Sequence, residues 1–293
     1  MHQPAADLVF SPLGLPHRDE VQRFFATAQH PLCEYSFGAL FAWQAVYDTH
    51  WASFADRWLL VRYLADGHER FVCPVGDDSD VRPAVDTCLR LLQRRGEDPR
   101  IDFVPARVAE RLRRDGYTLV DDRDNADYVY SREELAELPG RRHHRKRNHV
   151  AAFLREGEHR FEPLTVENHR EALALAERAS GDLGAPEISA LMRGLENHEQ
   201  LGFMGRLLRG HHGRATGLAL GEPLDAETFV VHFEIADRTY PGAYQALCQL
   251  YSRAVPPHFR FINREQDMGA PGLRRAKLSY HPLRLEPAYS LHA

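Results

Sequence analysis

The order of helical and strand-like segments runs through the chain twice, and this order most limits the folds open to it. Each half begins with helices, continues with a strand hairpin and a further strand, and then alternates helix and strand. Short apolar runs bounded by turn residues favour strands, whereas apolar residues at intervals of three and four favour helices. The pattern predicts the α+β (α/β) class, with mixed central sheets flanked by helices.

The length of the chain favours two domains. It has 293 residues, and domains commonly contain about 100–200. Pro139 and Gly140 interrupt a predicted helix, a basic cluster follows, and a second helical stretch ends just before Gly157. We therefore expect one domain at residues 1–156 and another at residues 157–293. The two halves show no obvious repeat of their residues.

Composition excludes several classes of protein. Hydrophobic residues make up 43% and charged residues 27%, which is an ordinary globular mixture. A net charge of −5 argues against a general nucleic-acid binder. No segment approaches the roughly 18–20 apolar residues that span a bilayer. The N-terminus lacks the pattern of a signal peptide, so we expect a cytoplasmic protein.

The cysteines and histidines predict no metal centre. The chain has 17 His without a ligand spacing such as HExxH, and its four Cys form no CxxC pair. We expect the cysteines to be small buried residues in a reducing compartment. They are Cys33, Cys73, Cys88 and Cys248.

Three motifs set the chain apart from a generic α+β protein. They read Cys-Glu-Tyr-Ser-Phe at 33–37, Asp-Arg-Asp-Asn-Ala-Asp-Tyr-Val-Tyr at 122–130 and Phe-Ile-Asn-Arg-Glu-Gln-Asp-Met-Gly at 261–269. The third continues as Gly-Leu-Arg-Arg-Ala-Lys-Leu-Ser-Tyr-His-Pro at 272–282. Together they resemble the bacterial DUF2156 family, whose members are often described as having a phosphatidylglycerol lysyltransferase C-terminal domain.

This resemblance covers nearly the whole chain and implies a fold and an activity. The fold is a tandem GNAT (acyl-CoA N-acyltransferase) fold, with a GNAT-like domain in residues 1–156 and a second, catalytic one in residues 157–293. The implied activity is transfer of an aminoacyl group from charged tRNA, as in the related Fem peptidoglycan transferases. Lys277 matches a lysine in the signature of the lysyltransferases. Those enzymes carry a membrane-spanning domain that this sequence lacks, so the acceptor, a small molecule or a lipid headgroup, stays open.

Transfer to an amine or hydroxyl needs a general base, and the loop after the predicted strand 259–263 offers two carboxylates. Glu265 or Asp267 would deprotonate the acceptor. Asp267 equally suits an ion pair with Arg264 that would fix the loop. Glu234 and Asp237, at the end of the preceding strand, are competing carboxylates. Tyr280 would donate a proton to the leaving oxygen, or belongs to the core.

Two segments are candidates for holding an anionic donor. GNAT enzymes bind a pyrophosphate at a helix N-terminus, and the matching segment reads Asp-Arg-Thr-Tyr-Pro-Gly-Ala at 237–243, with its spacing off by one residue. Arg238, Gly242 and Ala243 would hold the anion there, or Gly242 simply forms a turn. Lys277 and Arg264 would neutralise the donor or stabilise charge at the scissile ester, or Lys277 is a surface lysine.

A basic run at residues 141–147 predicts either a solvated helix face or a contact with the phosphates of a tRNA acceptor stem. We expect no certain cofactor, with aminoacyl-tRNA as the donor and coenzyme A as the alternative. Acetyl-CoA-dependent N-acetylation and a non-catalytic tRNA- or anion-binding module therefore stay open as functions. The candidate tRNA contacts are Arg145, Lys146, Arg147, Asn148 and His149.

Overall fold

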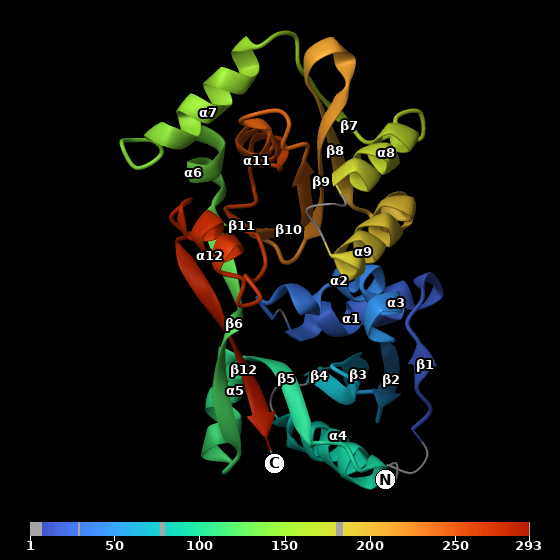
Figure 1. Ribbon diagram of the computed structural model, residues 1–293. Coiled ribbons are helices and arrows are strands. Elements are labelled where there is room, and N and C mark those ends of the chain that lie inside the picture. The colour runs from blue at the N-terminus through green and yellow to red at the C-terminus, as the bar shows by residue number, and fades with distance from the viewer. Residues whose placement is uncertain (1–7, 29, 77–79, 180–183, 293) are drawn as a thin grey trace. The chain divides into compact units, whose positions relative to one another are not determined.

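The computed structural model describes residues 8–28, 30–76, 80–179 and 184–292, which form two compact units (Figure 1). Unit 1 comprises residues 1–127, 266–271 and 285–293, and unit 2 comprises residues 128–265 and 272–284. The boundary predicted near Gly157 does not coincide with this division, because residues 128–156 pack with unit 2 and the C-terminal strand with unit 1. Periodicity in a sequence marks the helices and strands but not which of them share a core.

The sheet of unit 1 is built around an antiparallel meander of β2, β3 and β4, after which α4 leads to β5, parallel to β4. Helix α1 covers one face of these strands and α4 the other (Figure 1). Helix α4 ends at Gly96, whose left-handed conformation suits a residue without a Cβ. The strands, in spatial order, are β1 (Ser11–Pro12), β2 (His50–Phe54), β3 (Trp58–Ala65), β4 (His68–Gly76), β5 (Arg100–Pro105), β12 (Arg284–His292) and β6 (Thr118–Ser131). The helices are α1 (Arg18–Ala28), α2 (Phe37–Ala42), α3 (Gln44–Tyr47), α4 (Arg82–Arg95) and α5 (Ala106–Arg114).

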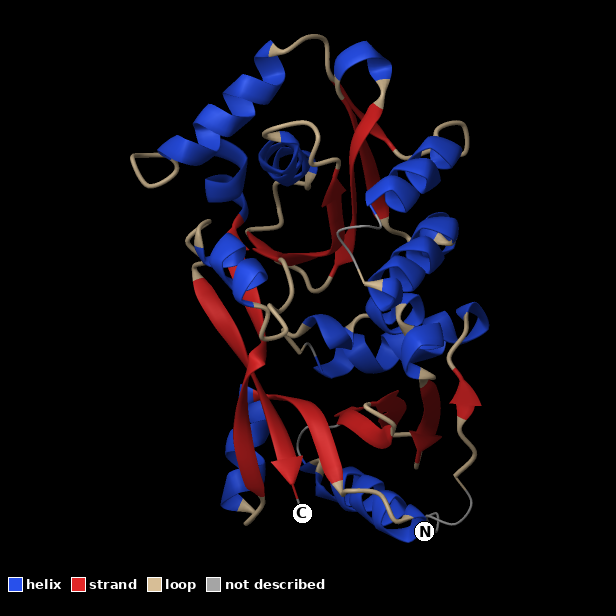
Figure 2. Ribbon diagram, viewed as in Figure 1, coloured by secondary structure: helices blue, strands red, loops and turns tan. Residues whose placement is uncertain are grey.

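Unit 2 repeats this order. Strands β8, β9 and β10 are antiparallel neighbours, and α11 then leads to β11, which runs parallel to β10. Helix α8 packs on one face of the sheet and α11 on the other (Figure 2). The strands, in spatial order, are β6 (from residue 128), β11 (Phe261–Asn263), β10 (Thr228–Ala236), β9 (Ala215–Pro223), β8 (Met204–Arg209) and β7 (Arg160–Pro163). The helices are α6 (Arg132–Glu137), α7 (His144–Arg155), α8 (His169–Ala179), α9 (Ala185–Glu196), α10 (His198–Leu201), α11 (Ala243–Ala254) and α12 (Pro271–Leu278).

In both units the parallel strand pair parts soon after it forms. Strand β10 registers with β11 from Thr228↔Phe261 to Val230↔Asn263, and there β11 ends while β10 continues to Ala236. An antiparallel meander, a crossover helix and a splayed parallel strand make each unit a GNAT-like α+β domain. The predicted fold class is therefore confirmed. No helix in the described residues combines the length and the apolar character that crossing a membrane requires.

The core of unit 2 is tightest where α11 meets β9 and β10. The side chains of Phe229, Leu247 and Tyr251 are buried there. Gly221 of β9 lies beneath them, and a Cβ built on it would lie 2.3 Å from the carbonyl oxygen of Val230 and 2.7 Å from the Phe229 ring. Backbone atoms cannot yield as a flexible side chain can, so this position requires glycine.

We predict that Gly221→Ala lowers the free energy of unfolding by about 1–3 kcal/mol, because the added methyl group overpacks the core. Urea denaturation monitored by far-UV circular dichroism measures this change. Gly272→Ala is the matched control, since a Cβ at Gly272 meets no atom within 4 Å. Equal unfolding midpoints for the two variants would contradict this account of the core.

Candidate active site

The candidate active site lies in unit 2, where β10 and β11 part. The register of β9 against β10 shifts between Val231 and Phe233, so His232 occupies a β-bulge. Bulges re-aim side chains and occur often beside active sites. The imidazole of His232 lies between two carboxylates: Nδ1 is 2.8 Å from an oxygen of Glu265, and Nε2 is 3.1 Å from one of Glu222. These residues form a chain from β9 through β10 to the loop after β11.

Opposite charges hold Glu222, His232 and Glu265 together. Burial alone lowers the pKa of His232, but hydrogen bonds to Glu222 and Glu265 outweigh that effect and raise its pKa to about 9. The imidazole is therefore protonated at neutral pH and donates from both nitrogens. The side chains of His232 and Glu222 are 2% and 6% exposed, whereas that of Glu265 is 19% exposed. Glu265 is thus the member of the chain that a ligand can reach.

The backbone that carries Glu265 is held in an unusual conformation. Glu265 has φ 56°, in the left-handed region that residues other than glycine rarely adopt. Its N–H donates to the side-chain oxygen of the buried Asn263. The Nζ of Lys277 donates to the carbonyl oxygens of Arg264 and Glu265, at 2.5 and 3.0 Å. Strained backbone kept in place by its surroundings is typical of functional sites.

Lys277, predicted to bind the donor, is directed into the protein. It is only 9% exposed, and its ammonium group lies on the two carbonyl oxygens of the loop that presents Glu265. This geometry makes Lys277 a residue that positions the site.

Arg264, in the same loop, carries a guanidinium enclosed by aromatic rings. Its Nη2 donates to Glu234 at 3.0 Å, and its guanidinium carbon lies 5.0 and 5.7 Å from the ring centroids of Tyr280 and Tyr130. Within the described residues its Nη1 has no hydrogen-bond partner. A guanidinium held flat by rings and with a donor to spare is suited to an oxyanion.

Tyr280, predicted as a proton donor, is 6% exposed, and burial raises the pKa of its phenol well above the usual value. It stays protonated and serves here as a wall beside Arg264. The Nζ of Lys146 lies 4.0 Å from the centroid of its ring, and burial lowers the pKa of that lysine.

The predicted tRNA-contact residues divide between two roles. Lys146 packs on Tyr280, and Arg147 donates to the carbonyl oxygens of Leu138 and Gly140. These two cations stabilise unit 2 internally. Three residues that share one exposed face of α7 remain for a partner: Arg145, Asn148 and His149.

The predicted anion site at the start of α11 is covered by a neighbouring helix. Gly242 has φ 90°, and a Cβ on it would lie 2.3 Å from the carbonyl oxygen of His149 in α7. Ala243 is 1% exposed, whereas Arg238 is exposed. The contact with α7 occupies the space beside Gly242, which argues against a pyrophosphate there.

Asp267, the other predicted base, lies in unit 1 and is fully buried. It accepts from Arg123 Nη1 at 3.3 Å and from the N–H of Gly269 at 3.0 Å. The predicted ion pair between Arg264 and Asp267 is therefore not formed. Asp267 pairs with Arg123 instead, and Arg264 pairs with Glu234. These contacts suit Asp267 to fixing its loop.

The sequence interpretation missed His232 and Glu222. The sequence does contain a signal for His232, because His232 and Glu234 are polar residues at alternate positions of an otherwise apolar strand. Alternation of this kind places both side chains on one face of the strand. The bulge at His232, which the sequence does not reveal, then changes how they are directed.

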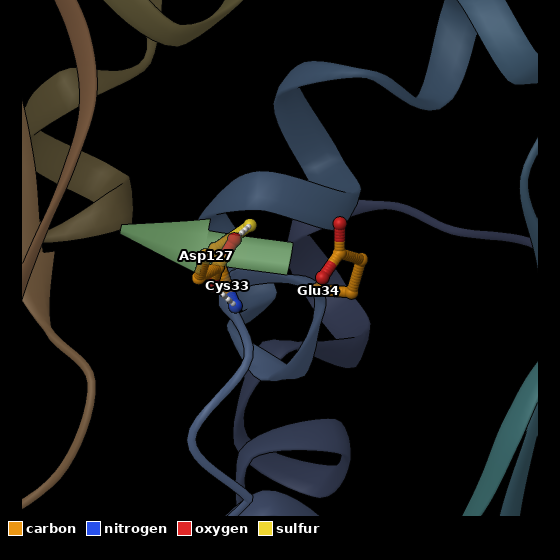
Figure 3. Close-up of side chains that lie close together, drawn as sticks. All are labelled: Cys33, Glu34 and Asp127. Atoms are coloured by element: carbon orange, nitrogen blue, oxygen red, sulfur yellow. Dashed lines mark hydrogen bonds between the residues drawn. The ribbon is translucent and has the colours of Figure 1, made fainter. Parts of the chain in front are cut away.

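Cys33, Glu34 and Asp127 form a close group in unit 1 (Figure 3). One potential ligand atom from each lies within 4.8 Å of the others, which is near enough to hold a metal ion. The atoms also form a hydrogen-bond network: Asp127 accepts from the N–H of Cys33 at 2.7 Å, and Glu34 accepts from Gln266 at 2.6 Å. This network holds the three side chains close to one another.

Each of the two units has a GNAT-like fold. The model of the family "Phosphatidylglycerol lysyltransferase, C-terminal" matches residues 25–292. The chain therefore belongs to this family, and the resemblance to DUF2156 proteins is confirmed. No curated protein matches the sequence.

Three solved structures illustrate the relationship. A conserved protein of unknown function from Bacteroides thetaiotaomicron VPI-5482 has a TM-score of 0.89 at 29% identity, over 97% of this chain and 99% of that one. L-PGS from Bacillus licheniformis has a TM-score of 0.68 at 13% identity, over 94% and 91% of the two chains. FemX has a TM-score of 0.61 at 11% identity, over 93% and 96%. At such low identity, the last two similarities concern the fold.

The charged state of His232 predicts how stability depends on pH. Its pKa is about 9 in the folded protein and 6.5 in the unfolded chain, so its contribution is complete below pH 6.5. As the pH rises through 9, up to roughly 3 kcal/mol of stability should be lost. An NMR titration of the imidazole N–H signals, with urea denaturation at each pH, measures both quantities. A titration midpoint at or below pH 6.5 would show that a charged His232 does not form hydrogen bonds to Glu222 and Glu265.

Proposed function

We propose that the protein transfers an aminoacyl group from aminoacyl-tRNA to an amine or hydroxyl acceptor, with unit 2 as the catalytic unit. The observation that carries the proposal is the placement of Glu265, whose side chain is partly exposed at the point where β10 and β11 part. Membership of the lysyltransferase family supports aminoacyl transfer. The names of two proteins with the same fold, L-PGS and FemX, agree with it.

In the proposed reaction, the acceptor nitrogen or oxygen attacks the carbonyl carbon of the aminoacyl ester while Glu265 takes its proton. A new bond forms between the acceptor and the carbonyl carbon, and the ester C–O bond breaks. The 3′ oxygen of the tRNA leaves and becomes a hydroxyl by taking the proton that Glu265 removed from the acceptor. His232 holds the carboxylate of Glu265 in place throughout, because both of its N–H groups are engaged.

Arg264 is the residue we assign to the negative charge that develops during transfer. The charge of its guanidinium can stabilise the carbonyl oxygen of the ester as that oxygen becomes an oxyanion, and the unpartnered Nη1, which is buried, can donate to it once the substrate displaces the atoms that cover it. Glu234 and the two tyrosine rings keep the guanidinium from turning away. This arrangement supports the predicted anion-binding role of Arg264.

We assign the tRNA to the exposed face of α7 that carries Arg145, Asn148 and His149. Contacts of this kind neutralise phosphates, so binding should weaken as salt is added.

Charged tRNA is a cytoplasmic molecule, and we propose the cytoplasm as the place of reaction. The coverage of Gly242 by α7 is the reason for preferring this donor over acetyl-CoA. We prefer catalysis to a non-catalytic binding module because a binding module would not need a partly exposed carboxylate such as Glu265.

We predict that Glu265→Gln reduces transfer by about 10²–10⁴-fold, because the amide cannot accept the proton of the acceptor. The amide oxygen can still accept from His232, so the fold should be kept. The measurement is release of a labelled amino acid from a pool of charged tRNAs, in the presence of screened amine and hydroxyl acceptors.

Glu227→Gln is the matched control for this experiment, since Glu227 is an exposed glutamate of unit 2 that pairs with Arg260. The control should transfer like the unaltered protein. Full activity of Glu265→Gln would remove Glu265 from the mechanism.

We further predict that Lys277→Met lowers kcat by about tenfold or more and leaves KM for the donor nearly unchanged, because the carbonyl of Arg264 loses its donor, that of Glu265 keeps only the N–H of Tyr128, and Glu265 shifts. The weaker bond from His232 to Glu265 should also lower the midpoint of the His232 titration. Steady-state kinetics and the NMR titration together test this. A raised KM with an unaltered titration would show instead that Lys277 touches the donor directly.

A further inference from the structure

A cavity of about 870 Å³ lies in unit 1, and none of the described residues that line it is assigned to catalysis. It lies where β4 ends at Gly76 and where α5 begins beside Arg107, directly after β5. Strands β4 and β5 are parallel and register only at Phe71↔Ile101 and Val72↔Asp102. In open α/β sheets, ligands bind in crevices outside the carboxyl ends of parallel strands. The volume is in the range of small-molecule sites.

One face of α1 forms a wall of this cavity. The lining residues of α1 follow each other at intervals of three and four, which places them on a single side of the helix. Phe24 and Ala28 give this face an apolar part, and Glu20, Arg23 and Thr27 give it a polar part. The opposite side of α1 packs on the sheet through Val21, which is fully buried. Helix α1 is therefore fixed, and its polar face points to the cavity.

The turn between β2 and β3 forms another wall. Ala55 and Asp56 both have positive φ, at 53° and 52°, in the three-residue connection between Phe54 and Trp58. Alanine is poorly suited to that conformation, so the turn is strained. A Cβ on Gly76 would lie 2.0 Å from the carbonyl oxygen of Arg57, so Gly76 lets the turn pack on the end of β4. The turn thereby presents Asp56 and Arg57 to the cavity, and Ser53 of β2 lines it beside them.

Positive charge is in excess among the lining residues that the structure describes. Arg23, Arg57 and Arg107 come from three different elements, against the carboxylates of Glu20 and Asp56. The charge of Arg107 acts on the interior as well. Burial lowers the pKa of nearby His30, and Arg107 lowers it further, to about 4.

We infer that this cavity is a binding site for a phosphate-bearing small molecule. Guanidinium groups present several N–H donors in a planar fork that matches phosphate oxygens. The oxygens of one phosphate can accept hydrogen bonds from several guanidinium groups at once. A ligand with a single carboxylate has only two oxygens, which three arginines would have to share. The apolar patch at Phe24 and Ala28 would contact the organic part of the molecule. Glu265 is not among the described residues that line the site, and binding there requires no transfer chemistry.

The experiment measures binding to the full chain by isothermal titration calorimetry at constant ionic strength. Inorganic phosphate and glycerol 3-phosphate are the soluble probes, with chloride as the reference anion. Sedimentation with vesicles of phosphatidylglycerol, against vesicles of phosphatidylcholine, tests a phosphate that belongs to a lipid headgroup. The variants are Arg57→Gln and Arg107→Gln, both at exposed positions. The matched control is Arg94→Gln, an exposed arginine of α4 outside the cavity.

We expect saturable binding of a phosphate probe that weakens about tenfold or more in each cavity variant and not in the control. Glu265→Gln should bind normally, so the result is independent of the proposed transfer activity. Binding to phosphatidylglycerol vesicles that needs Arg57 would assign the phosphate to a lipid headgroup, and binding of soluble probes alone would assign it to a free metabolite. No saturable binding, or binding that ignores both arginines, would overturn the inference.

Discussion

A protonated histidine between two glutamates is the interaction on which unit 2 depends. Without the charge of His232, the carboxylates of Glu222 and Glu265 would face one imidazole without compensation, in a site from which water is largely excluded. Breaking a buried group of charges by removing one member is costly, because the remaining charges are left unpaired. The Glu222–His232–Glu265 group joins β9, β10 and the loop after β11, and the ion pair between Arg264 and Glu234 links that loop to β10 a second time. These links therefore fix the ends of the strands that border the site.

The loop after β11 is fixed from its other side by backbone bonds. The N–H of Arg264 donates to the carbonyl of Tyr128, and the N–H of Tyr128 donates to the carbonyl of Glu265. Together with Lys277, these bonds determine where Arg264 and Glu265 lie before any substrate arrives. Catalysis gains from groups that need no rearrangement during the reaction. The strained φ of Glu265 is then the conformational cost of a fixed base.

Much of this could be predicted from the sequence. The alternation of segments predicts the fold class, and the motif at 261–282 predicts a functional loop that contains Arg264 and Glu265. The sequence could not show that Lys277 faces inward, because a lysine in a short helix is usually solvated. It could not show that α7 covers Gly242, since the contact joins residues about ninety positions apart. The bulge at His232 and the division of the chain at residue 127 depend on tertiary packing in the same way.

The central claim is that the donor is an aminoacyl-tRNA, and binding across a salt series tests it most directly. The purified protein would be titrated with aminoacylated tRNA, with deacylated tRNA and with acetyl-CoA at several salt concentrations. The proposal predicts that charged tRNA binds most tightly and that its affinity falls steeply with salt, as phosphate contacts require. Tight, salt-insensitive binding of acetyl-CoA, with no preference for charged over deacylated tRNA, would contradict it.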